Sequence, residues 1–163
     1  IRSNAQNRYV PNFSYGKGKI VWNFESVNMP AGTDGFLYLN GDTWHWNGAA
    51  NGAGWIQIRI YPQDSTTKSS FKLHYDWTAE EFTLEESMND IKTIELDTKV
   101  DPEDATKVNV TFSINGKVYY SGKKHNAFDL DGHKGVIFYS GFSGPFSPEC
   151  TIVFKSLDYE VYE

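Results

Sequence analysis

The feature that most constrains the fold is a succession of short segments in which apolar and polar residues alternate with a period of two. This alternation is typical of half-buried strands. The segments are 19–28, 35–40, 54–61, 70–77, 91–99, 106–114, 117–121, 134–141 and 150–161. Asn115-Gly116 lies between two of them, and both residues tolerate the positive φ of a tight hairpin turn. About nine strands with almost no helix predict a β-sandwich or a barrel.

The length of 163 residues suits one domain, 1–163, with enough interior for a hydrophobic core. We expect residues 1–16, which are polar and lack periodicity, to form an irregular N-terminal arm. Segment 78–90 alone has a helical pattern, in which Thr78 and Glu81 fit a capping box. The sequence starts at Ile1 without a signal peptide, which fits a removed leader or a domain cut from a longer protein. We expect a secreted or extracellular protein.

Charge and composition exclude several classes of partner. The formal net charge is -6, so the chain has no general attraction for nucleic acid or for an anionic membrane surface. No apolar run approaches the roughly 20 residues of a membrane-spanning helix. Cys150 is the single cysteine, which excludes an intramolecular disulfide and a cysteine zinc site.

Alternation also assigns residues to faces of the predicted strands. In 106–114 the predicted buried row is Val108, Val110, Phe112 and Ile114, and in 19–28 it is Ile20, Trp22 and Phe24. In 54–61 the predicted buried row is Ile56, Ile58 and Ile60, and the opposite row is Trp55, Gln57, Arg59 and Tyr61. In 70–77, Lys72, His74 and Asp76 are predicted to face outward.

The outward row of 54–61 differs from an ordinary solvated face, because it combines flat aromatic rings with planar hydrogen-bonding groups. Sugars stack their C–H faces on aromatic rings and form hydrogen bonds with amide, carboxylate and guanidinium groups. Trp44 and Trp46 share one parity in the preceding loop, so both can project to one side. The predicted carbohydrate-binding residues are Trp44, Trp46, Trp55, Gln57, Arg59, Tyr61, His74 and Asp76.

Structural alternatives exist for these residues. Tryptophans on one face of a sheet also form a satellite core cluster under a loop. Arg59 could instead form a cross-strand ion pair with Glu25 or Asp76.

Asp129-Leu130-Asp131-Gly132 resembles the start of a calcium-binding loop. An EF-hand needs a glutamate at the twelfth position of the loop, where this chain has Ser140. We leave open a structural Ca²⁺ held by Asp129 and Asp131, although the predicted function requires no cofactor.

Two sets of residues allow a catalytic alternative. Glu95 and Asp97 share one face of a strand and could serve as the carboxylate pair of a glycoside hydrolase. Gln57, Arg59 and His74, with one of several tyrosines, could instead serve a polysaccharide lyase. The chain has no G-x-S-x-G motif, the usual cue for a serine hydrolase.

The C-terminal third resembles the concanavalin A-like lectin/glucanase superfamily. The resemblance lies in the Lys107–Tyr120 stretch with its Asn-Gly turn, the Gly-rich strand Lys134–Gly141 and the returning strand Thr151–Val161. It implies an all-β, two-sheet antiparallel jelly-roll β-sandwich with a concave face, where members of the superfamily often recognise glycans.

The sequence departs from the two enzymatic branches of this superfamily. Glucanase members carry Glu-x-Asp-x-Glu or Glu-x-Asp-x-x-Glu, whereas the segment 95–100 here lacks the last glutamate. Alginate-lyase-like members carry Gln-Ile-His, where this chain has Gln57-Ile58-Arg59. The resemblance therefore implies a non-catalytic carbohydrate-binding module for a polysaccharide or oligosaccharide, which could be appended to a catalytic domain. A small polysaccharide lyase or glycoside hydrolase of this fold, and a protein-interaction β-sandwich, are the alternatives.

Overall fold

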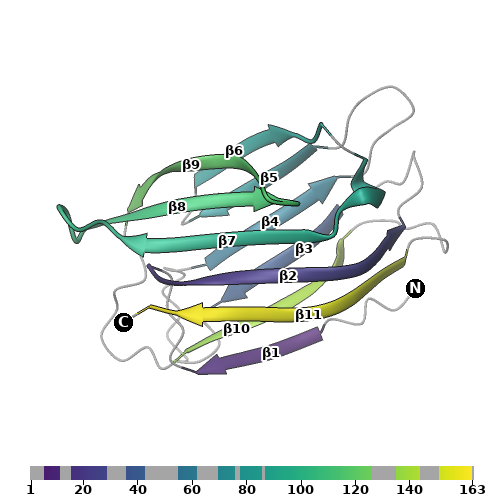
Figure 1. The fold of residues 1–163 in the computed structure, drawn as a ribbon, viewed down its shortest axis with the longest axis horizontal. Coiled ribbons are helices and arrows are strands. Elements are labelled where there is room, and N and C mark those ends of the chain that lie inside the picture. Colours follow the sequence, from purple (N-terminus) through teal and green to yellow (C-terminus); the bar gives the residue numbers. More distant parts are fainter. Residues whose placement is uncertain are drawn as a thin grey trace.

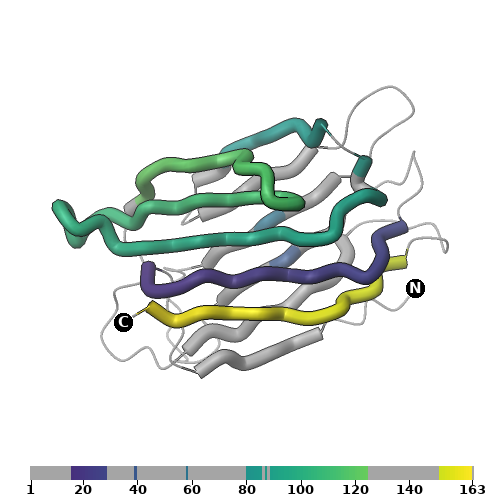
Figure 2. Tube along the Cα trace, viewed as in Figure 1, coloured from purple at the N-terminus to yellow at the C-terminus, as the bar shows by residue number. Residues whose placement is uncertain are grey.

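The computed structural model describes the backbone of residues 6–11, 16–28, 36–42, 55–61, 70–75, 78–85, 87–125, 135–143 and 151–162. The side chains described are those of 16–28, 39, 58, 80–85, 87, 89–124 and 151–162. Figure 2 colours these residues along the chain.

Two antiparallel sheets lie one over the other (Figure 1). The six-stranded sheet has the order β1-β10-β3-β4-β5-β6, and the five-stranded sheet has the order β11-β2-β7-β8-β9. The strands are β1 (Gln6–Pro11), β2 (Lys17–Asn28), β3 (Phe36–Asp42), β4 (Trp55–Tyr61), β5 (Ser70–Tyr75), β6 (Thr78–Thr83), β7 (Thr93–Val100), β8 (Lys107–Ile114), β9 (Lys117–His125), β10 (Gly135–Ser143) and β11 (Thr151–Val161). The chain changes sheet five times, after β1, β2, β6, β9 and β10. The neighbours β1 and β10, β10 and β3, β11 and β2, and β2 and β7 are therefore distant in sequence.

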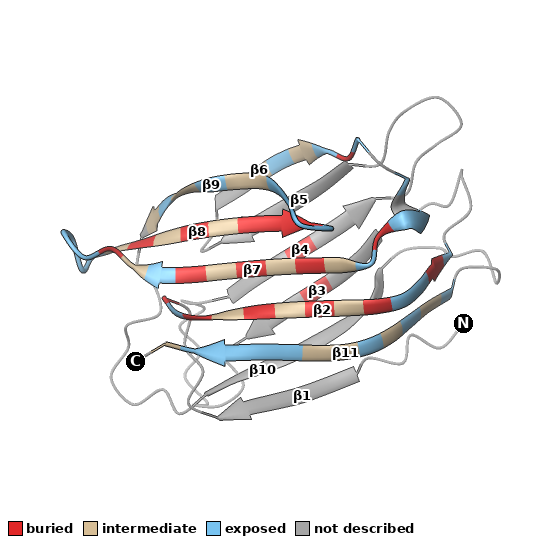
Figure 3. Cartoon of the chain, viewed as in Figure 1, coloured by how far each residue is buried: buried red, intermediate tan, exposed pale blue. Residues whose placement is uncertain are grey.

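The core between the sheets comes from one face of each strand. Burial alternates along β2, β7 and β8, as the predicted rows require (Figure 3). The buried apolar residues are Ile20, Trp22, Phe24, Val27, Leu39, Ile58, Leu84, Ile91, Ile94, Leu96, Val108, Val110, Phe112 and Ile114. The sequence prediction is confirmed for the rows of 19–28 and 106–114 and for Ile58. The side chains of Ile56 and Ile60 lie outside the described residues.

The edge strands β6 and β9 are joined across one side of the sandwich. The Phe82 ring lies 5.9 Å from the Tyr120 ring and 6.4 Å from the Phe112 ring. The Lys124 ammonium lies 2.5 Å from a Glu80 carboxylate oxygen and 5.3 Å from the centroid of the Tyr120 ring. Apolar contact and an ion pair therefore connect the two sheets where their backbones form no ladder.

The β8–β9 hairpin turns at Asn115 and Gly116, which have φ of 49° and 79°. The Asn115 side-chain oxygen accepts hydrogen bonds from the backbone N–H groups of Lys92 (2.7 Å) and Thr93 (3.0 Å). Its amide nitrogen donates to the carbonyl of Asp90 at 3.0 Å. One side chain thus fixes the hairpin to the segment that follows the short 3-10 helix Met88–Asp90.

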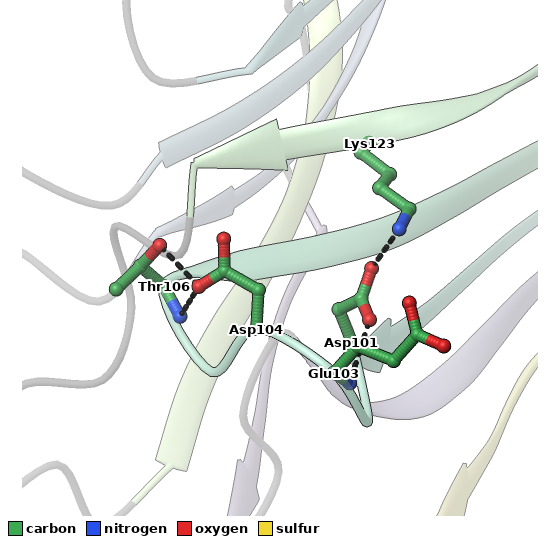
Figure 4. Close-up of polar contacts among 5 residues, drawn as sticks. All are labelled: Asp101, Glu103, Asp104, Thr106 and Lys123. Carbon is green, nitrogen blue, oxygen red and sulfur yellow. Dashed lines mark hydrogen bonds and ion pairs between the residues drawn. The ribbon is translucent and has the colours of Figure 1, made fainter.

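The β7–β8 connection is held by two aspartates (Figure 4). Asp101 is only 3% exposed; it accepts a hydrogen bond from the Glu103 N–H at 2.9 Å and contacts the Lys123 ammonium from β9. Asp104 accepts hydrogen bonds from the N–H (3.0 Å) and the hydroxyl (2.6 Å) of Thr106. The Lys123 hydrogen bond, followed by the Glu103 N–H, holds the pKa of Asp101 below its ordinary value. The Thr106 donors lower the pKa of Asp104 in the same way.

Three expectations differ from the structure. Residues 6–11 of the expected irregular arm form β1, which pairs with β10. Thr78 and Glu81 lie in strand β6, so the capping box is wrong: β6 gains ladder hydrogen bonds from β5, and local capping cannot match these. With β1 and β6 the described chain has eleven strands.

Within the described residues, the single helix is far too short to cross a membrane.

Asn115→Ala is expected to lower the free energy of unfolding by about 2–4 kcal/mol, because three hydrogen bonds are lost and alanine resists positive φ. Chemical denaturation measures the effect. Asn115→Gly keeps the backbone conformation and removes only the hydrogen bonds. If the glycine variant is as stable as the original chain, these hydrogen bonds do not hold the turn.

Asp101→Asn is expected to flatten the acid limb of the stability profile. Because the pKa of Asp101 is lowered in the folded state, its contribution is complete above its unfolded pKa near 3.8 and is lost as the pH falls through the lower folded value. The midpoint of urea unfolding, measured from neutral pH to about pH 2, gives the profile. Glu103→Gln, which keeps the backbone donor, is the matched control. Parallel profiles for the original chain and Asp101→Asn would contradict this role.

Candidate functional site

The register of the six-stranded sheet aligns polar residues from separate strands. One row has one residue from each strand of the sheet: Asn7, Tyr139, Asn40, Gln57, His74 and Ala79. A second row contains Gly141, Tyr38, Arg59, Lys72 and Glu81. A third contains Tyr9, Ile137, Asp42 and Trp55. Antiparallel partners lie about 4.5–5.5 Å apart at their Cα atoms, so each row is nearly continuous.

Burial identifies the face to which these rows belong. Leu39 and Ile58 are partners in adjacent strands, and both are fully buried against the five-stranded sheet. Residues one position away in a strand belong to the other face. Gln57 and Arg59, on either side of Ile58, therefore occupy the outer face. Glu81 on β6 is exposed, as this assignment requires.

The structure brings five of the predicted ligand-binding residues together. Trp55, Gln57, Arg59 and Tyr61 occupy alternate outer-face positions along β4, and His74 on β5 is the Cα partner of Gln57. Trp44, Trp46 and Asp76 lie outside the described residues, as do the candidate calcium ligands Asp129 and Asp131. For all ten residues, ligand or metal binding stays a prediction.

Sequence reasoning missed the partners that other strands supply. Tyr38 and Asn40 share one parity in β3, and Tyr139 lies in β10. Alternation could have assigned the first two to one face, but it carries no information on which strands are neighbours. Register places Asn40 beside Gln57 and Tyr139 beside Asn40.

The same register excludes one structural alternative. Glu25 lies on β2, whose neighbours are β11 and β7 in the five-stranded sheet. A cross-strand pair between Arg59 and Glu25 is therefore wrong. Arg59 has Tyr38 and Lys72 as its Cα partners instead.

The outer-face rows supply several kinds of recognition chemistry. Asparagine and glutamine amides each offer donors and an acceptor, and tyrosine and histidine add groups that donate or accept. Aromatic positions at Trp55, Tyr38 and Tyr139 add flat apolar surface. A ligand with many hydroxyl groups and apolar ring faces matches this combination.

The carboxylate pair considered for a glycoside hydrolase lies on the other sheet. Glu95 and Asp97 occupy β7, at positions alternating with the buried Ile94, Leu96 and Thr98, so they belong to the outer face of the five-stranded sheet. The Tyr162 hydroxyl donates a hydrogen bond to Asp97 at 2.7 Å. Burial, followed by this hydrogen bond, raises the pKa of the Tyr162 hydroxyl.

Several other polar groups on this face of the five-stranded sheet are paired with one another. The Asn23 amide donates to Ser156 (3.0 Å) and to Asp158 (2.7 Å), and Lys19 forms an ion pair with Glu160 at 3.9 Å. No group of three or more potential metal ligands occurs within the part of the chain that the structure describes. This face is a hydrogen-bonded surface in which Asp97 has a structural partner.

Comparison with known proteins identifies the fold. No family model and no curated protein sequence matches the chain. An alginate lyase mutant in complex with an alginate trisaccharide superposes with a TM-score of 0.52 and 13% identity, over 96% of this chain and 72% of that one. A β-1,3-glucanase from Mycobacterium marinum superposes with a TM-score of 0.50 and 10% identity, over 94% and 67%. The chain thus has the predicted fold: an antiparallel, two-sheet jelly-roll β-sandwich of the concanavalin A-like type.

Proposed function

We propose that this protein is a non-catalytic carbohydrate-binding domain that binds a polysaccharide across the outer face of its six-stranded sheet. The observation that carries the proposal is the pair of rows through Gln57 and Arg59. In these rows, residues of the amide, imidazole, guanidinium and phenol types occupy neighbouring positions on four strands. Positions fixed on strands need little ordering when a ligand binds, which favours affinity.

The fold gives this proposal independent support. The alginate lyase described above is in complex with an alginate trisaccharide, and another protein of this fold is a β-1,3-glucanase. Both names belong to proteins that handle carbohydrate. Because identity is low, the residues of this chain, rather than the likeness, must identify its ligand.

A polysaccharide lyase is the second candidate. Lyases need a group that neutralises a uronate carboxylate, together with a base and an acid for proton transfer. Gln57, His74 and Tyr139 lie in one row and offer these types of group. The glycoside hydrolase alternative has less support, because Glu95 and Asp97 belong to the opposite outer face and Asp97 is hydrogen-bonded to Tyr162.

Trp55→Ala and Gln57→Ala are each expected to remove most retardation in native affinity gels that contain the bound polysaccharide. Outer-face positions contribute little to the core, so thermal unfolding should shift by only about 2 °C or less. The panel contains neutral and acidic plant, algal and microbial polysaccharides. Tyr159→Ala, which removes a 42% exposed aromatic residue of the five-stranded sheet, is the matched control and should bind normally.

Collapse of stability in Trp55→Ala or Gln57→Ala would identify these residues as structural and contradict the proposal. Absence of retardation on every polysaccharide would also overturn it. In that case concentration-dependent self-association or protein binding would favour the protein-interaction alternative.

No unsaturated or reducing ends are expected when the protein is incubated with the polysaccharide that it binds. Ultraviolet absorbance and a reducing-end assay measure the products. Sustained turnover would contradict the non-catalytic proposal. Loss of that turnover in Tyr139→Phe and His74→Gln, with binding retained, would then assign a lyase, whereas loss in Asp97→Asn would assign a hydrolase.

A further inference from the structure

Residues with cationic or protonatable side chains lie on two adjacent strands of the six-stranded sheet, β4 and β5. Arg59 on β4 and Lys72 on β5 are Cα partners. His74 lies two residues from Lys72 on the same face, about 7 Å along the strand, and is the partner of Gln57. Three such positions are therefore immediate neighbours on the outer face.

On the described strands of this sheet, few acidic residues accompany these three positions. On the described strands of the six-stranded sheet, the acidic residues at outer-face positions are Asp42 and Glu81. Glu81 is the Cα partner of Lys72, so opposite charges occupy paired positions there. Asp42 is the partner of Trp55, four residues from Arg59, which is about 13 Å along β4 and beyond the ~8 Å Debye length at physiological salt. In the row of Arg59, the nearest acidic residue on the described strands is therefore Glu81, which lies two strands away.

The negative net charge of the chain makes the group of Arg59, Lys72 and His74 unusual. The formal net charge is -6, so the molecule as a whole repels polyanions. An anionic ligand would therefore need a specific group of cations. Arginine suits this purpose, because its guanidinium binds carboxylate and sulfate oxygens through two parallel hydrogen bonds.

We propose that the polysaccharide is anionic and that Arg59 holds its carboxylate or sulfate groups, with His74 and Lys72 beside it. This inference rests on the proposed carbohydrate-binding function and adds the chemical class of the ligand. Gln57 and Asn40, in the neighbouring row, would hydrogen-bond the hydroxyl groups of the same chain.

Pairs of polymers that differ in charge test this inference. The probes are alginate and its propylene glycol ester, polygalacturonate and highly methyl-esterified pectin, and dextran sulfate and dextran. The charged member of at least one pair should bind at least tenfold more tightly than its neutral form, and its affinity should fall as salt is raised. Preference for a uronate pair or for dextran sulfate would distinguish carboxylate from sulfate recognition.

Substitutions that remove one positive charge locate the site. Arg59→Gln should weaken binding of the preferred polyanion about tenfold or more. Lys72→Gln should weaken it about two- to threefold, because the acidic Glu81 occupies the paired position on β6. Lys155→Gln removes the same charge from an exposed position on β11 of the other sheet and should change affinity by less than about twofold.

The outcomes separate this inference from the proposed function. Equal binding of charged and neutral forms would overturn the anionic class but leave carbohydrate binding intact. Binding of a polyanion that Arg59→Gln and Lys155→Gln weaken equally would reflect general charge and overturn the site. If the protein binds none of these polymers and none of the polysaccharides in the wider panel, both proposals are overturned.

Discussion

Burial of one face of each strand is the constraint on which the rest of this molecule depends. Ile58 and Leu39 are fully buried against the five-stranded sheet, and this fixes the register of β4 on β3. Because side chains alternate, a slip by one residue would move Gln57 and Arg59 to the core face and Ile58 to the outer face. The free energy that buries Ile58 therefore also determines which groups the outer face presents. The same register of β4 on β3 therefore determines both the core and the candidate site.

The two outer faces of the sandwich carry different types of residue. On the five-stranded sheet, polar groups such as Asn23, Asp97 and Asp158 bond with one another or with Tyr162. Hydrogen bonds that are already formed leave little for a ligand to gain. On the six-stranded sheet, the rows combine aromatic residues with amides and cations from several strands. For this reason the proposed carbohydrate site lies on the six-stranded sheet and not beside the carboxylates of β7.

Much of this architecture could be predicted from alternation alone. The buried rows of 19–28 and 106–114 and the Asn115-Gly116 turn follow from local residue patterns, and the structure confirms them. Strands β1 and β6 were missed, because edge strands carry more polar residues and their pairing energy comes from a distant partner. For the same reason the row of Gln57 was predicted only within one strand. Asn40 and Tyr139 join it through pairings that no local pattern encodes.

The pairing of β11 with β2 has a consequence for how the chain is made. These strands are partners from Val161–Gly18 to Thr151–Asn28, so their residues are more than a hundred positions apart. A ribosome releases β2 long before β11 exists. Until 151–161 emerge, one edge of β2 lacks its partner while its apolar row of Ile20, Trp22 and Phe24 is already present. Such long-range sheets form slowly, and the unpaired edge exposes the nascent chain to association with other chains.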